Sequence, residues 1–152
     1  GKLGGSIDLL LETPTNNKVV LDLKWSHYPR SYKAKLQEGK ALQLAAYTSV
    51  VAGDQADARC LAGFFLLRQS LLYFNSEDVF PKYTFVASDV SLKDTWLTAT
   101  EHFRQTMKQL QEGKLTATGV DTDNNPNPDG WLVEPPCGFC NFSSFCGKRI
   151  LR

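Results

Sequence analysis

Two short apolar stretches lie near the start of the chain, on either side of a polar segment. Residues 5–11 and 19–25 are rich in the branched apolar side chains that favour β-strands. The intervening residues 13–17 (Thr-Pro-Thr-Asn-Asn) are typical of a turn. We therefore predict a β-hairpin. Each of its strands carries one acid, and the pairing of the strands is expected to bring Asp8 close to Asp22.

The second predicted strand has a charged face. Because side chains alternate across a strand, Asp22 and Lys24 are expected on one side, and Leu21 and Leu23 on the other. A buried lone carboxylate costs several kcal/mol unless a cation or donor pairs with it. With Asp8 nearby, two carboxylates supply the hard oxygen ligands that Mg²⁺ or Mn²⁺ prefers, and a lysine beside them suits phosphodiester hydrolysis. The alternative is a simple Asp–Lys ion pair at a strand end.

The rest of the chain alternates between predicted strands and helices. The pattern predicts a loop, a helix, three strands and a long helix, at residues 26–35, 40–51, 59–67, 71–75, 83–87 and 91–113. One apolar stripe of the last helix is expected to face the sheet, through Trp96, Ala99, Phe103, Met107 and Leu110. The fold class that follows is α/β, with a central mixed β-sheet flanked by helices.

The predicted loop at residues 26–35 interleaves aromatic and basic side chains. Such a composition suits contact with a nucleic-acid backbone or with unstacked bases. An ordinary solvated surface loop explains the same composition equally well.

The acid-bearing strands and the segment that follows them resemble a known family. Asp8, then Asp22 and Lys24, resemble the second half of the PD-(D/E)XK nuclease signature, and the stretch from Gly39 to Tyr47 resembles the glycine, glutamine and tyrosine motif of its RecB-like branch. The resemblance implies a restriction-endonuclease-like core that cleaves DNA. It also implies that Gln43 and Tyr47, four residues apart on one helix face, lie beside the metal site.

The resemblance gives each site residue an expected role. Asp8 and Asp22 would bind Mg²⁺ or Mn²⁺, with the Leu23 carbonyl as a further ligand. Lys24 would assist the attacking water, and Gln43 would position metal, water or DNA. Tyr47 would share that role, although its identity fits a core aromatic equally well.

Three cysteines gather near the end of the chain. Cys137, Cys140 and Cys146 have the spacing of thiolates that bind zinc or an iron–sulfur cluster. In RecB-like nucleases of the AddB type, a similar trio joins an upstream cysteine to hold a [4Fe–4S] cluster. The fourth cysteine, Cys60, lies in a predicted buried strand and is expected to be a core residue rather than a ligand.

The resemblance also predicts how the chain is organised. Residues 1–115 are expected to form the nuclease core, 116–136 a polar linker and 137–152 the cysteine-rich tail. A complete family member has a helix before the first acid strand, with a further carboxylate and the first cluster cysteine. The chain is therefore expected to be a piece of a longer recombination or repair protein, whose other domains or an associated helicase would be its partners.

Composition is consistent with one compact domain and adds few constraints. The chain has 152 residues and a formal net charge of +1, so no overall positive field indicates nucleic-acid binding. No apolar run is long enough to cross a membrane, and the clustered cysteines favour an intracellular metal site over disulfides. The predicted function is a metal-dependent deoxyribonuclease, in particular an exonuclease. The alternatives are an inactive structural module of the same fold and a zinc-binding interaction domain.

Overall fold

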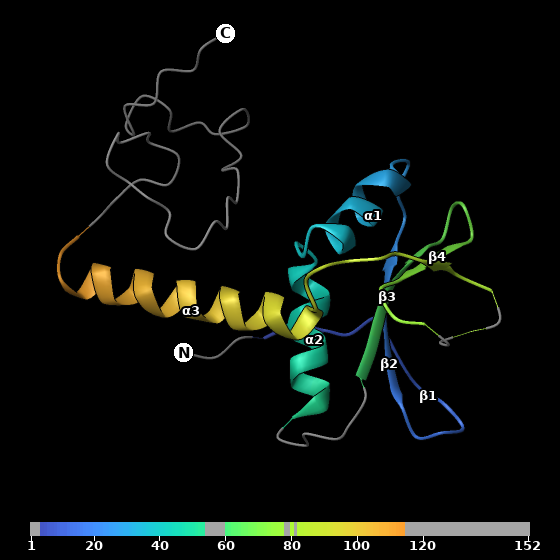
Figure 1. Ribbon diagram of the computed structural model, residues 1–152, viewed down its shortest axis with the longest axis horizontal. Coiled ribbons are helices and arrows are strands. Elements are labelled where there is room, and N and C mark those ends of the chain that lie inside the picture. The colour runs from blue at the N-terminus through green and yellow to red at the C-terminus, as the bar shows by residue number, and fades with distance from the viewer. Residues whose placement is uncertain (1–3, 54–59, 78–79, 81, 115–152) are drawn as a thin grey trace, which may run out of the picture. The chain divides into compact units, whose positions relative to one another are not determined.

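The computed structural model describes residues 4–53, 60–77, 80 and 82–114. The chain divides into two units, Gly1–Arg104 and Gln105–Arg152, and the sheet lies within the first. The elements follow in the order β1 (Leu9–Glu12), β2 (Lys18–Lys24), α1 (Pro29–Gln37), α2 (Leu42–Ala52), β3 (Cys60–Leu66), β4 (Leu71–Phe74), β5 (Thr84–Phe85) and α3 (Leu92–Gln111) (Figure 1).

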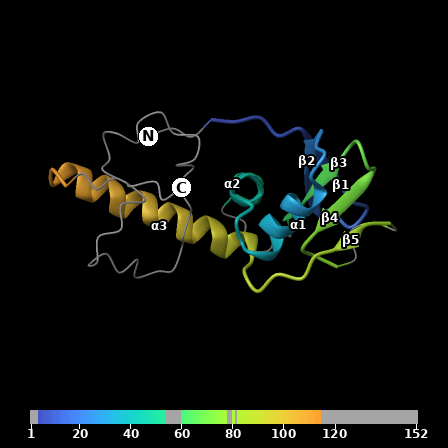
Figure 2. The same ribbon diagram turned by 90° about the horizontal axis from the view of Figure 1, so that it is seen from above.

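The five strands form one mixed sheet in sequence order, β1-β2-β3-β4-β5. β1 pairs antiparallel with β2, β2 parallel with β3, β3 antiparallel with β4, and β4 parallel with β5. Parallel strands need a crossover connection, and α1 and α2 provide it between β2 and β3. Both helices lie on the same side of the sheet (Figure 2). The predicted mixed sheet with flanking helices is confirmed.

The predicted hairpin is present, but its first strand is shorter than expected. Thr13 N donates to the Asn17 carbonyl at 2.9 Å, and Asn16 adopts a left-handed φ of 59°, which asparagine tolerates better than most residues. β1 begins at Leu9, so Asp8 precedes the strand instead of lying within it. The Asp8 side chain accepts the N–H of Leu23, a backbone donor that a longer β1 would otherwise use.

The loop predicted at residues 26–35 is wrong, because helix α1 begins there. Pro29 stands at the first helical position, where its missing N–H costs nothing and its fixed φ suits the helix. Gly39 follows the helix with a left-handed φ of 64°. Tyr32 packs edge-on against Phe64 of β3, with ring centroids 5.1 Å apart. The apolar contact with the sheet therefore stabilises a helix that the local sequence did not reveal.

Each face of the sheet has its own apolar cluster. The face covered by α1 and α2 includes Val20, Leu36, Leu44, Phe64 and Leu66. The opposite face includes Val19, Leu21, Leu61 and Phe74. Val20 thus points toward the helices, while its neighbours in β2 point away from them. The alternation predicted for β2 is confirmed, and it places Asp22 on the helix-covered face.

Helix α3 begins as predicted but packs differently. Asp94 N donates to Ser91 Oγ at 3.0 Å, a side-chain N-cap of the expected kind. The expected apolar stripe is largely exposed, with Phe103 66% and Leu110 42% accessible. The one fully buried side chain of α3 is Thr95, which donates to the Gly39 carbonyl at 3.1 Å. Within the described part of the chain, no helix has the length and apolar character needed to cross a bilayer.

Candidate active site

The centre of the site is a fully buried carboxylate. Asp22 lies in β2, between β1 and β3, and its side chain has no exposed surface. Val20, two residues earlier in β2, lies on the same face of the sheet, beneath the helices α1 and α2. A strand position so enclosed usually carries an apolar residue, because an ion there loses its hydration. The carboxylate therefore needs a partner that offsets this loss.

Lys24 is that partner, from the same strand face. Its Nζ lies 3.0 Å from Asp22 Oδ1 and 2.8 Å from Oδ2. The bond to Oδ1 has hydrogen-bond geometry, whereas buried Oδ2 is close to the positive charge but has no hydrogen-bond donor. The lysine side chain itself remains 27% exposed. It therefore connects a buried anion to the edge of the site.

Burial and charge shift the pKa values of both groups. Burial raises the pKa of the Asp22 carboxyl; Lys24 opposes this effect, and the nearby charge of Asp8 adds to it. For Lys24, burial lowers the pKa, but the hydrogen bond and charge of Asp22 outweigh it, so the pKa of the ammonium is raised. The lysine consequently stays protonated at neutral pH.

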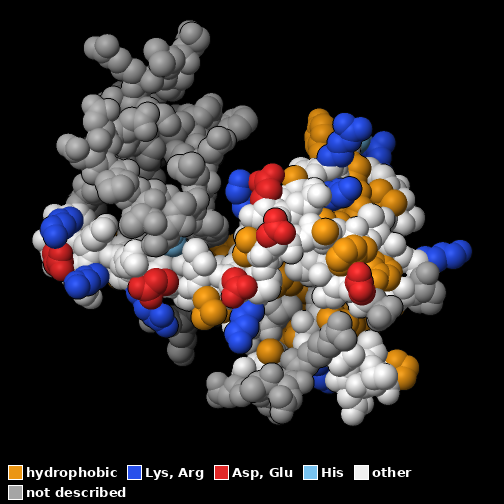
Figure 3. Space-filling view, viewed as in Figure 1, with side chains coloured by type: hydrophobic (Ala, Val, Ile, Leu, Met, Phe, Trp, Pro, Cys, Tyr) orange, Lys and Arg blue, Asp and Glu red, His pale blue; other side chains and the backbone are white. Residues whose placement is uncertain are grey.

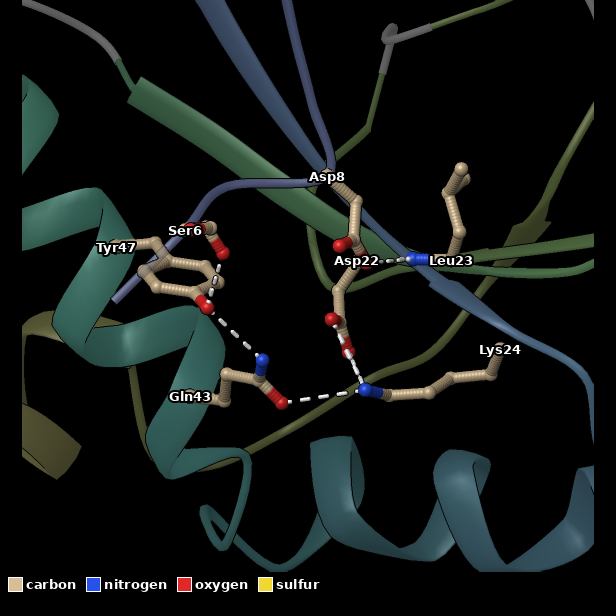
Figure 4. A network of polar contacts seen from close by, with 7 residues as sticks. All are labelled: Ser6, Asp8, Asp22, Leu23, Lys24, Gln43 and Tyr47. Carbon is tan, nitrogen blue, oxygen red and sulfur yellow. Dashed lines mark hydrogen bonds and ion pairs between the residues drawn. The ribbon is translucent and has the colours of Figure 1, made fainter.

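Asp8 approaches the pair from the segment just before β1. Its Oδ2 accepts the backbone N–H of Leu23 at 2.8 Å, which fixes the carboxylate against β2 (Figure 4). Its influence on the pKa of Asp22 shows that the two carboxylates lie within interaction range. The hairpin thus brings together the two acids that the sequence predicted. Leu23 contributes its N–H in this arrangement, whereas the sequence singled out its carbonyl.

Helix α2 supplies the other two predicted residues. Lys24 Nζ donates to Gln43 Oε1 at 3.2 Å, and Gln43 Nε2 donates to the Tyr47 hydroxyl at 3.0 Å. Tyr47 in turn donates to the carbonyl of Ser6 at 2.5 Å (Figure 4). The tyrosine also packs against the core cluster, which agrees with the core-aromatic interpretation, while its role at the site stays a prediction. A continuous chain of hydrogen bonds joins the lysine to the segment that carries Asp8.

Two contributors escaped the sequence analysis. The Ser6 carbonyl is a backbone atom, and no residue pattern reports on it. Tyr32 of α1 packs against the core cluster on the face of the sheet that carries Asp22 and Lys24. The signal for Tyr32 was its position in a helix that the sequence analysis took for a loop. The i, i+4 spacing of Tyr32 and Leu36, which both pack on the sheet, was the available clue.

The cysteine predictions divide between described and undescribed residues. Cys137, Cys140 and Cys146 lie outside the residues that the structure describes, as do the predicted linker and tail. Cys60 is partly buried against the core, and burial raises the pKa of its thiol. These observations agree with its predicted role as a core residue. Raising its pKa makes the thiolate, which is the metal-binding form, harder to form.

The donor set of the site fits a hard divalent cation. Two carboxylates converge on β2, and one oxygen of the buried carboxylate, Asp22 Oδ2, has no hydrogen-bond donor. Carboxylate oxygens are the ligands that Mg²⁺ and Mn²⁺ prefer. Among the described residues, no group of three or more His, Cys, Asp or Glu side chains is placed to hold a metal ion. The protein would therefore offer two carboxylates and leave the remaining coordination to backbone, water or substrate oxygens.

The fold and the site together define a class of protein. A mixed five-stranded sheet with flanking helices, bearing two acids and a lysine at one end of β2, fits an α/β fold of the restriction-endonuclease type. The chain matches the PD-(D/E)XK nuclease superfamily over residues 1–147, and it belongs to that superfamily. This membership indicates a nuclease domain. No match was found among curated proteins or among solved structures.

Proposed function

We propose that this chain is a metal-dependent nuclease domain that hydrolyses DNA phosphodiester bonds. The observation that carries the proposal is the fully buried Asp22 paired with Lys24, beside the anchored Asp8. A buried ion pair is weak as a stabilising device, because desolvation offsets much of its attraction. The presence of this pair at a fully buried strand position is therefore better explained by chemistry than by stability.

Asp8 and Asp22 would hold the divalent cation, with the Leu23 carbonyl as a further oxygen ligand. When bound, such a cation neutralises the charge that develops on the scissile phosphate. Because Asp22 is withdrawn from water while Asp8 is exposed, the pair presents one fixed and one accessible carboxylate. An arrangement of this kind binds a cation at the surface of the sheet, where a phosphate can reach it.

Lys24 acts as a hydrogen-bond donor and a positive charge. The raised pKa of its ammonium means that it holds its proton at neutral pH, so it is unsuited to remove a proton from water. Its partial exposure lets it reach a water or a phosphoryl oxygen and stabilise negative charge in the transition state. Gln43 accepts from the ammonium and fixes its direction, and Tyr47 fixes Gln43 in turn.

The first test is Mn²⁺ binding by calorimetry to the wild-type chain and to Asp22→Asn. The variant removes the charge and keeps the shape, so binding should be lost while the fold is retained. Glu12→Gln is the matched control, since Glu12 is an exposed carboxylate on the neighbouring strand, paired with Lys18. Binding that survives in Asp22→Asn would place the cation elsewhere and contradict the proposal.

Lys24→Ala tests the chemistry directly. The variant should lose DNA cleavage while still binding Mn²⁺, because the lysine holds no metal in this scheme. Cleavage at the wild-type rate would contradict the role of the ammonium. An inactive structural module of this fold is the second candidate, favoured by the fact that the described residues offer only two acids here. It predicts no carboxylate-dependent Mn²⁺ binding and no cleavage by any variant.

The finer proposals rest on the resemblance and on cysteine spacing. We propose that the domain acts as a RecB-like exonuclease within a larger recombination or repair protein. Cys137, Cys140 and Cys146 would hold a [4Fe–4S] cluster, or zinc in the alternative. Metal analysis of the purified chain separates these cases, because a cluster gives iron and a brown chromophore, whereas zinc gives neither.

A further inference from the structure

The loop between β2 and α1, which begins directly after Lys24, exposes two large aromatic side chains. Trp25 follows Lys24 in sequence and is 74% exposed, and Tyr28, just before α1, is 76% exposed. Tryptophan and tyrosine usually bury much of their surface, since each can bury 150–250 Å² or so of largely apolar area. Two of them left in solvent, one and four residues after Lys24, indicate a surface for binding.

The backbone of this loop is fastened at several points. The Ser26 carbonyl accepts from the Gln69 side chain at 2.9 Å, and Leu67 N donates to the Lys24 carbonyl at 3.0 Å. Tyr28 N donates to Ser26 Oγ at 3.0 Å. The loop is therefore held against the β3–β4 turn while its aromatic rings project outward. A rigid backbone with exposed rings lowers the entropy lost on binding.

The surroundings of the loop carry positive charge. Residues 25–37 contain Arg30, Lys33 and Lys35 and no acid, and Arg68 of the adjoining turn contacts the His27 ring. These four positive charges exceed the net +1 of the whole chain, so all other residues together carry −3. Lys and Arg side chains gather with hydrophobic ones at the end of the sheet unit where α1 lies (Figure 3). The charge is concentrated there although the chain as a whole is nearly neutral.

We infer that Trp25 and Tyr28 form a stacking platform for unpaired bases of single-stranded DNA next to the scissile phosphate. This inference rests on the proposed function and adds the form of the substrate. Bases stack on aromatic rings irrespective of sequence, but only when they are not already paired in a duplex. The neighbouring basic side chains neutralise the phosphates of the same strand. The platform selects single-stranded over blunt double-stranded DNA.

The test is equilibrium binding of a fluorescent oligothymidylate, followed by anisotropy in EDTA so that no cleavage occurs. Trp25→Ala and Tyr28→Ala should each weaken binding by about tenfold, in line with the loss of one stacked base. Binding of a blunt duplex of equal length should change little. Phe103→Ala is the matched control, because Phe103 is an aromatic residue of α3 with similar exposure, 66%. It should leave binding unchanged.

Wild-type affinity in both aromatic variants would overturn the platform, and so would equal losses for single-stranded and duplex DNA. Arg30→Ala provides an independent measurement. It should lower the salt dependence of oligothymidylate binding by about 0.7 in the log–log slope, the value for one lost phosphate contact. Cleavage assays of Lys24→Ala in Mg²⁺ keep the two proposals apart, because they test the nuclease and not the stacking of bases. If both aromatic variants bind DNA normally and cleavage still depends on Lys24, the platform is wrong and the proposed nuclease function stands.

Discussion

Replacing Lys24 by methionine should destabilise the fold strongly, because it leaves the buried carboxylate of Asp22 without its cation. Methionine keeps most of the aliphatic stem of lysine and removes only the ammonium. Asp22, with no exposed surface, then loses the cation 2.8 Å from its Oδ2.

The magnitude follows from the burial of the pair. Removing one partner of a buried ion pair typically costs about 3–5 kcal/mol. The lower end is expected here, about 3 kcal/mol, because Lys24 is 27% exposed and Asp22 can take up a proton. Domains of this size are stable by about 5–15 kcal/mol, so the variant should still fold. With an m value near 2 kcal/mol per molar urea, its midpoint should fall by roughly 1–2 M.

The strand provides its own control. Lys18, at the other end of β2, pairs with Glu12, and the two side chains are 41% and 52% exposed. Exposed pairs contribute about 0–1 kcal/mol, so Lys18→Met should barely move the urea midpoint. Both variants are compared with the wild type by urea unfolding at about pH 8. Equal small losses in the two variants would refute the reasoning, since the buried carboxylate would then not depend on Lys24.

The raised pKa of Asp22 also sets how the stability of the fold changes with pH. Because the folded protein has a raised pKa at Asp22, it holds that proton at pH values where the unfolded chain has released it. Stability therefore falls as pH rises from the ordinary value of 3.8 through the raised pKa. Losing Lys24 removes the group that opposes this rise. The deficit of Lys24→Met should thus be largest at neutral and basic pH and shrink in acid.

Two further predictions concern metal binding and packing. Protonation of Asp22 competes with the cation, so Mn²⁺ affinity measured by calorimetry should fall as pH drops through the raised pKa; an affinity that stays constant down to pH 3.8 would contradict this. Gly63→Ala should cost about 1–3 kcal/mol in urea unfolding, because its Cβ would lie 2.5 Å from the Tyr73 carbonyl oxygen. Gly4→Ala, with no atom within 4 Å, is the control, and equal stability of the two variants would show that the sheet yields at Gly63.

Local pattern was sufficient for β2 and for the face on which its acid lies. β2 spans residues whose alternation of side chains is regular, so the face of Asp22 could be predicted without any long-range information. The same holds for Gln43 and Tyr47, which share one face of α2 because they are four residues apart. The hydrogen bond of Lys24 to Gln43 required the folded sheet and helix together. The resemblance predicted Gln43 beside the site of Lys24, but it did not predict the contact between the two side chains.

Tertiary contacts decided the parts that the pattern missed. α1 has a polar composition that suggests a loop, yet Tyr32 and Leu36 pack on the sheet and stabilise a helix. For α3 the error was the opposite, since its regular apolar spacing predicted burial that Phe103 does not have. Amphipathic spacing predicts which residues share a helix face. Whether that face meets a partner depends on the rest of the fold.

The position of Asp22 also bears on the order in which the domain assembles. Its strand pairs in parallel with β3, in register with Phe64, and residues 25–59 separate the two strands. Parallel pairing across so long a connection is slow, because the entropy of closing the loop is lost before the contacts between the strands form. The helices α1 and α2 in this connection also cover the face that carries Asp22, so their packing removes water from the carboxylate. The burial of this charge therefore opposes the packing of the helices on the sheet, in addition to the slow pairing of β2 with β3.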